Sequence, residues 1–142
     1  MAPLVVSVFM SEYAVELEVR FRDIDAMGHV NNAVYATYTE QARTRYARDV
    51  LETDLSSVPT VLASLSIEYR RPVLLSDGAV TVSIDVPEIG TSSLPMEYTI
   101  ATPDGDVAAE AESTQVFLDP ETERPAPIPE PYRSAIVDYH DL

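Results

Sequence analysis

Two carboxylates stand where a predicted strand gives way to a predicted helix, in the stretch RFRDIDAMGHVNN at residues 20–32. Apolar and charged residues alternate over positions 15–21, and the apolar parity next reaches Asp23 and Asp25. Burying carboxylates beside an apolar face is unfavourable unless specific contacts hold them there. A carboxylate can act as a nucleophile or general base, and the first turn of a helix offers free N–H groups to a developing negative charge. This stretch is therefore the first candidate for a catalytic site.

The helix that would place those N–H groups is predicted over residues 31–51. Apolar residues recur there at spacings of three and four and form one stripe: Val34, Tyr35, Tyr38, Ala42, Tyr46 and Val50. Asn31 is a plausible N-cap, and Gly28 allows an unusual turn in the loop before it. The predicted helix thus begins directly after the two acids.

Period-two patterns predict five strands, one over residues 12–22 and four after the helix, within residues 59–75, 79–90, 93–101 and 106–119. The turn signals SDG, IGTSS and TPDGD separate the last four, and such short connections imply antiparallel neighbours. One helix with a broad apolar stripe, facing a sheet with one apolar face, indicates an α+β domain.

The predicted domain organisation has three parts. Residues 1–11 form an N-terminal leader, with Met10 as a possible second start, and residues 12–118 form the domain itself. Residues 119–142 form a proline-rich C-terminal tail, expected to be extended with one helical turn at 131–137. The N-terminal residues lack the basic region and cleavage site of a signal peptide.

Composition limits the classes of function. The chain has 142 residues, 24 acidic residues, nine basic residues that are all arginine, and a net charge of −15. This charge disfavours binding to nucleic acid and to anionic membrane surfaces, and no apolar run is long enough to span a membrane. Acid excess without lysine predicts adaptation to molar salt, the alternative being an ordinary acidic cytosolic protein. With no cysteine to fix a redox compartment, the cytoplasm is the default location.

The stretch RDIDAMGHVNNAVYATYTEQAR at residues 22–43 resembles the signature of the 4-hydroxybenzoyl-CoA thioesterase family of the hotdog fold. The likeness covers nearly the whole chain, including the closing RPAPIPEPYRSAI at residues 124–136. It implies a five-stranded antiparallel sheet wrapped around one long helix. It also implies an acyl-CoA thioesterase, hydrolysing a thioester to a free acid and CoA at sites on a dimer interface.

The resemblance also suggests catalytic roles. Asp25 matches the family's catalytic aspartate, as nucleophile or general base, and the backbone amide of Asn32 would polarise the thioester carbonyl. The structural alternative for Asp25 is a residue that caps the helix or tightens the turn, and Asp23 is expected to form the turn, exposed or bonded to backbone. Glu40 is the second candidate catalyst, and its alternative is an ion pair with Arg43 or with a partner subunit.

Further residues are candidates for substrate binding. His29 and Asn31 would shape or line the pocket, with proton transfer by His29 as the alternative. Arginine clamps phosphates bidentately, so neighbouring arginines at a strand end would contact the phosphates of CoA: Arg70 and Arg71. The serines of the turn GTSS would lie near the pantetheine: Ser92 and Ser93. No metal or cofactor is expected, since the two histidines lie far apart in sequence.

Two other functions remain open. An enoyl-thioester hydratase or dehydratase pairs an aspartate with a histidine five residues later, a position that Val30 occupies here. A non-catalytic acyl-CoA binding protein is the other. The expected assembly is a homodimer pairing sheets edge to edge, or a homotetramer. Acyl-chain preference, CoA versus a carrier protein, and covalent versus water-mediated attack also stay open.

Overall fold

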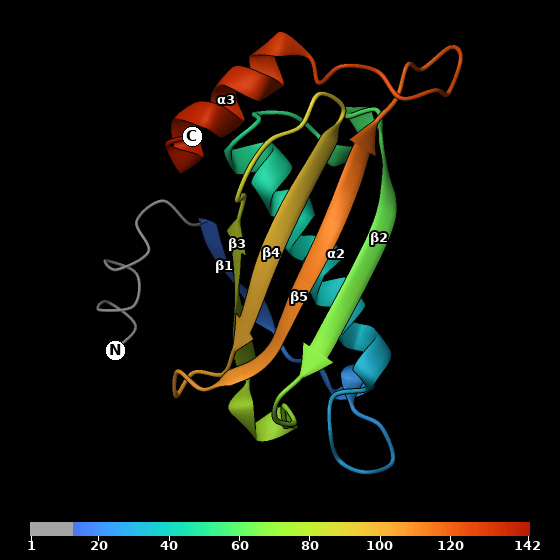
Figure 1. Ribbon diagram of the computed structural model, residues 1–142. Helices are drawn as coiled ribbons and strands as arrows, with labels where there is room; N and C mark the ends of the chain where they lie inside the picture. Colours follow the sequence, from blue (N-terminus) through green and yellow to red (C-terminus); the bar gives the residue numbers. More distant parts are fainter. Residues whose placement is uncertain (1–12) are drawn as a thin grey trace.

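The computed structural model describes residues 13–142, so the predicted leader at residues 1–11 lies outside them. Five strands form one antiparallel sheet in the order β1-β3-β4-β5-β2. Their bounds are β1 Tyr13–Glu18, β2 Thr60–Tyr69, β3 Ala79–Asp85, β4 Ser93–Ala101 and β5 Val107–Phe117. The long helix α2, Asn32–Asp49, lies along one face of this sheet (Figure 1). This is the architecture of the hotdog fold that the resemblance implies.

Strand β1 is shorter than its sequence pattern predicts. It ends at Glu18, and the chain turns into the short 3-10 helix η1, Phe21–Asp23. The Asp23 carboxylate stabilises this turn because its Oδ2 accepts the Arg20 N–H at 2.9 Å. As a result Phe21, on the apolar parity of the predicted strand, is 80% exposed. The strand predicted over residues 12–22 therefore runs too far.

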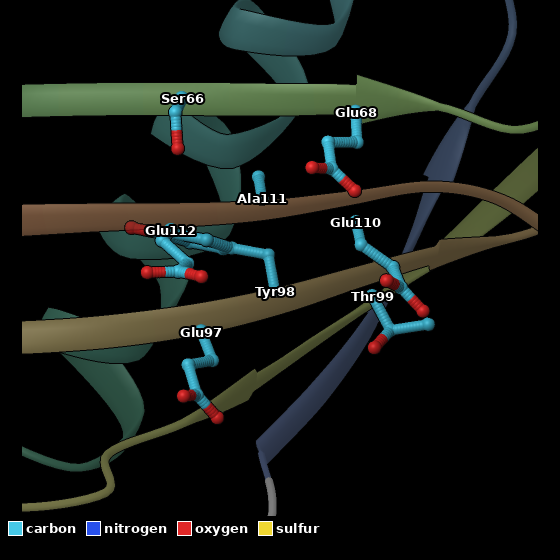
Figure 2. A pocket seen from close by; sticks show the side chains of 8 residues that line it. All are labelled: Ser66, Glu68, Glu97, Tyr98, Thr99, Glu110, Ala111 and Glu112. Carbon is cyan, nitrogen blue, oxygen red and sulfur yellow. The ribbon is translucent and has the colours of Figure 1, made fainter.

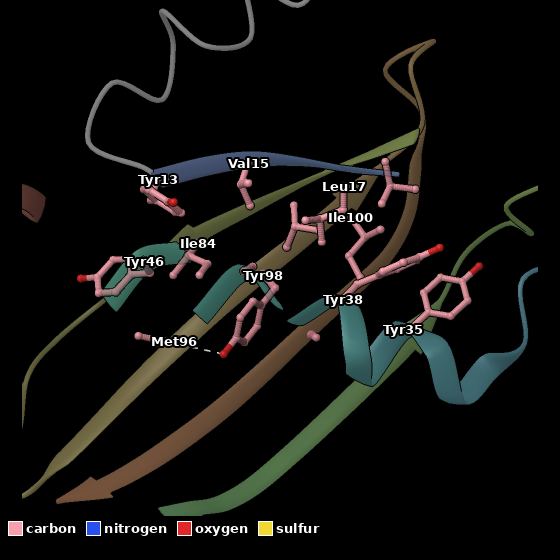
Figure 3. Close-up of a cluster of buried hydrophobic side chains, with 14 of the residues drawn as sticks. Tyr13, Val15, Leu17, Tyr35, Tyr38, Tyr46, Ile84, Met96, Tyr98 and Ile100 are labelled. Carbon is pink, nitrogen blue, oxygen red and sulfur yellow. Dashed lines mark hydrogen bonds between the residues drawn. The ribbon is translucent and has the colours of Figure 1, made fainter. Parts of the chain in front are cut away.

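The core lies between α2 and the inner face of the sheet. Figure 3 shows Tyr35, Tyr38 and Tyr46 of the helix among strand side chains such as Ile84 and Ile100. All five of these side chains are buried. The apolar stripe of the helix thus meets the apolar face of the strands, as the two periodicities predict.

Strand β2 is an edge of the sheet and lies mostly in solvent. It pairs with β5 on one side, and Val61 and Leu62 are 47% and 42% exposed. Natural edge strands usually carry charges, prolines or other obstacles to further pairing. Residues 60–67 of β2 carry no charge and no proline, so this edge is open to another strand.

The C-terminal tail is more ordered than its proline content predicts. Helix α3, Glu130–His140, has 11 residues and is longer than the single predicted turn. It packs on the core through Ile136 and His140, which are both buried. The imidazole Nε2 of His140 lies 2.9 Å from the hydroxyl oxygen of Tyr46, and its Nδ1 lies 3.6 Å from Asp85 Oδ1. Burial raises the pKa of Tyr46, which keeps this phenol neutral.

We expect His140→Phe to lower the free energy of unfolding by about 1–3 kcal/mol, because the buried Tyr46 hydroxyl loses its partner. Thermal unfolding monitored by circular dichroism measures the loss. The double variant Tyr46→Phe/His140→Phe should recover part of it, since removing both polar groups leaves nothing unsatisfied. A single variant as stable as the parent protein would contradict the importance of this contact.

Candidate active site

Residues 23–31, called the site loop below, fold into a tight hairpin between η1 and α2. The Asn31 N–H donates to the Asp23 carbonyl at 2.8 Å, and the Asp25 N–H donates to the His29 carbonyl at 2.8 Å. A turn over residues 25–28 closes the hairpin, where the Gly28 N–H donates to the Asp25 carbonyl at 3.0 Å. Gly28 has φ of +84°, which side chains disfavour, and this explains the glycine in the motif.

The half-buried Asp25 carboxylate is held by the backbone of its own turn. Its Oδ1 accepts the Met27 N–H at 2.9 Å and the His29 N–H at 3.2 Å. Among residues 13–142, both hydrogen bonds that this carboxylate accepts use Oδ1, which leaves Oδ2 for another ligand. The turn-forming role considered above for Asp25 is therefore real, but it uses one oxygen and leaves the other available for chemistry.

At the N-terminus of α2, one backbone amide has no hydrogen-bond acceptor among residues 13–142. Asn31 caps the helix, as predicted, because its Oδ1 accepts the Ala33 N–H at 2.8 Å. The Val34 N–H donates to the Asn31 carbonyl at 2.9 Å. For the Asn32 N–H, the described part of the chain provides no acceptor. This amide carries the positive end of the helix dipole and is free to bind an oxyanion.

The Asp23 side chain holds the start of the site loop. Its side chain is 6% exposed and lies 3.6 Å from the Arg20 guanidinium. It forms the turn and binds backbone, as predicted, but it is buried. The nearby Tyr38 hydroxyl is also buried, without a hydrogen-bond partner among residues 13–142. Burial, and then the charge of Asp23, raise the pKa of Tyr38.

The other predicted residues of the motif lie either in the site loop or farther along α2. His29 lies in the site loop and pairs its backbone with Leu74. Glu40 is exposed on α2, about 12 Å along the helix axis from Asn32. Arg43 is buried and donates to Thr39 Oγ1 and to the Tyr98 hydroxyl at 3.0 Å. Among residues 13–142, Glu40 and Arg43 do not form the ion pair considered above.

The two candidate phosphate ligands lie at the end of β2 and already have acidic partners. Arg70 Nη2 lies 2.8 Å from Glu68 Oε1 and 3.0 Å from Glu110 Oε1. The hydrogen bond to Glu110 raises the pKa of Arg70. Arg71 Nη1 lies 2.6 Å from Asp106 Oδ2. A phosphate would have to compete with these carboxylates.

The serines of the turn GTSS lie away from the site loop. Figure 1 shows the connection between β3 and β4 at the opposite end of the sheet from the loop that precedes α2. The Ser92 and Ser93 carbonyls accept bonds from Phe117 and Gly90 at 2.8 Å and 2.9 Å, and so hold that end of the sheet. A single chain therefore does not bring Ser92 and Ser93 to Asp25.

A hollow of about 280 Å³ lies on the face of the sheet opposite α2 (Figure 2). Four glutamates line it: Glu68, Glu97, Glu110 and Glu112. Such a surface repels phosphates and offers little to an acyl chain, so it is a poor acyl-CoA site.

Tyr69 follows Leu65 and Ile67 on one face of β2 by simple alternation. Its hydroxyl donates to the Asn32 carbonyl at 2.9 Å and connects the end of β2 to the first turn of α2. An aromatic residue at a strand end gives no local signal for this contact, which joins positions 37 residues apart.

Comparisons with known proteins identify the family of this chain. Residues 19–136 match the model of the thioesterase-like superfamily. The long-chain acyl-CoA thioesterase FadM of Escherichia coli is 32% identical over 117 residues, which cover 77% of this chain and 85% of that protein. The putative acyl-CoA thioesterase YneP of Bacillus subtilis is 28% identical over 129 residues, covering 88% and 90%.

A solved structure is also similar in sequence. The thioesterase of Thermus thermophilus crystallised with coenzyme A and zinc superposes with a TM-score of 0.81 at 38% identity, covering 91% of this chain and 94% of that one. Among residues 13–142, no helix is long and apolar enough to cross a membrane. The match to the family model and these relatives show that the chain belongs to the thioesterase-like superfamily.

Proposed function

We propose that this protein is an acyl-CoA thioesterase, with Asp25 as nucleophile or general base and the Asn32 backbone amide as oxyanion donor. The observation that carries the proposal is the site loop, which holds a carboxylate with one oxygen left free among the described residues and leads directly into the first turn of α2, where the Asn32 N–H has no acceptor among them. The names of the relatives support the acyl-CoA part. The 4-hydroxybenzoyl-CoA thioesterase family is the narrower assignment within this proposal.

The proposed reaction has two forms. As a general base, Asp25 takes a proton from water while the water oxygen bonds to the thioester carbon. The C–S bond then breaks, and the CoA thiolate leaves and takes up a proton. As a nucleophile, Asp25 itself displaces the thiolate and forms an anhydride, which water hydrolyses. In both forms the Asn32 N–H binds the carbonyl oxygen as its negative charge develops, an interaction that lowers the barrier.

A second copy of the chain belongs to this proposal. The open edge of β2 fits an antiparallel partner strand, and a two-fold axis there would join two sheets edge to edge. Such pairing sets the site-loop end of one copy beside the opposite end of the other. Ser92 and Ser93 of one copy would then lie at the same end of the assembly as Asp25 of its partner. Two such pairs would form the tetramer. The proposed location of the protein is the cytoplasm.

A panel of acyl-CoA thioesters tests the function, with thiol release recorded in about 0.1 M and about 2 M KCl. We expect thiol release from at least one acyl class. A hydratase would change the absorbance of an enoyl-CoA without releasing thiol, and a binding protein would do neither. The hydratase is the weaker candidate because His29 follows Asp25 by only four residues.

We expect the melting temperature to rise steeply from about 0.1 M to about 2 M KCl. At a net charge of −15, repulsion destabilises the fold, and salt shortens the Debye length from about 10 Å at 0.1 M to about 3 Å at 1 M. Excluded salts also strengthen apolar burial. Glu121→Gln/Glu123→Gln, which changes exposed acids outside the site, should reduce the salt requirement. An equal melting temperature throughout this range would exclude adaptation to high salt.

A further inference from the structure

We infer that Tyr69 is a positioning residue for the oxyanion site, holding the first turn of α2 so that the Asn32 N–H keeps its direction. This inference rests on the proposed function, because it concerns the amide that would bind the thioester oxygen. Its physical basis is a single long-range contact, in which the Tyr69 hydroxyl donates to the Asn32 carbonyl at 2.9 Å.

That hydrogen bond is not required to satisfy the tyrosine itself. Tyr69 is 45% exposed, so water can bind its hydroxyl in the absence of the helix. The bond instead acts on Asn32, whose N–H and carbonyl belong to the two successive peptide groups at the start of the helix. Helix ends fray unless they are anchored. A donor from another element restricts the rotation of these two peptide groups.

Two further contacts make Tyr69 a firm anchor. Its ring packs edge-on against Tyr35 of α2, with 5.0 Å between centroids and an interplanar angle of 89°. Its backbone is paired with Ala109 of β5, and the Arg70 N–H and Arg71 N–H both donate to the Ala108 carbonyl directly after it. The sheet therefore fixes the backbone of Tyr69 and the helix fixes its ring, which together set the position of the hydroxyl.

The contact complements the cap from the site loop. Asn31 holds the amides of Ala33 and Val34, and Tyr69 holds the carbonyl of Asn32. The Asn32 N–H is thus the group that neither anchor uses, and it projects from a turn fixed on both sides. An oxyanion donor needs such preorganisation, because any reorientation during the reaction reduces its contribution.

Tyr69→Phe tests the inference, since it removes the hydroxyl and keeps the ring that packs on Tyr35. We expect kcat on the best acyl-CoA to fall about 3- to 10-fold, the equivalent of one hydrogen bond, while KM changes less than about twofold. The matched control is Tyr139→Phe. Tyr139 lies on α3, is 39% exposed, and has no hydrogen bond from its hydroxyl among the described residues. This control should keep both constants.

Amide hydrogen exchange and the ¹⁵N shift of Asn32, measured by NMR in Tyr69→Phe without substrate, give a second readout that does not depend on activity. We expect faster exchange at residues 32–34 and a displaced Asn32 signal. An unchanged kcat, or a raised KM at constant kcat, would overturn the positioning role. If the parent protein released no thiol from any acyl-CoA, the proposed function would fail. The NMR comparison would then decide alone whether Tyr69 holds the turn, and unchanged exchange would refute it.

Discussion

Asp25→Asn should reduce kcat at least about 100-fold while the protein keeps its fold and melting temperature. The amide has no charge and cannot act as a base or nucleophile, and a positioned acid or base contributes about 10²- to 10⁴-fold. Its Oδ1 can still accept the Met27 and His29 N–H groups that close the turn. The substitution therefore separates the chemical role of Asp25 from its role in the loop. Thiol release under saturating acyl-CoA, with thermal unfolding beside it, measures both.

Asp25→Ala is the matched comparison for that experiment. It removes the charge and the two hydrogen bonds together, so it should lose activity and also lower the melting temperature. If Asp25→Asn kept more than about a tenth of the parent kcat, about 1.4 kcal/mol of barrier, Asp25 would not be the catalyst. Glu40→Gln, at the exposed acid on α2, would then be the next variant to measure.

Val61→Asp should convert the assembly to monomers and abolish most of the activity. Val61 is 47% exposed on the open edge strand β2, where a charge opposes pairing with another strand. In a dimer built about this edge, each copy would repel its partner. Light scattering at micromolar concentration in about 2 M KCl should show the mass of one chain, half that of a dimeric parent protein or a quarter that of a tetrameric one.

Leu142→Asp is the control for the edge variant, because Leu142 has the same 47% exposure but lies at the end of the chain, after α3. It should keep the mass and the activity of the parent. The specific activity of the parent protein should also fall on dilution, as dimers dissociate. A parent protein that is monomeric in high salt, or a monomeric Val61→Asp with full activity, would exclude a site shared between copies.

The contacts that are local in sequence could be predicted from the residues. The stripe of α2 and the cap at Asn31 follow from the helical period and from backbone N–H groups that need an acceptor. The turn from Asp25 to Gly28 follows from residue types suited to its geometry. Each of these features depends on residues a few positions apart, whose relative placement the backbone geometry itself dictates.

Contacts between distant residues were decided only by the tertiary structure, through the order of the strands and the docking of the helices. Because β5 lies between β4 and β2, Glu110 lies next to Arg70 and forms an ion pair with it. The sequence suggests that the same arginine binds a phosphate of CoA. The burial of His140 against Tyr46, 94 residues away, depends on where α3 docks. The same holds for Tyr69, which alternation places only on the same face of β2 as Leu65 and Ile67. Period-two patterning reports the face on which a residue lies, and only the packed sheet brings that residue to the start of α2.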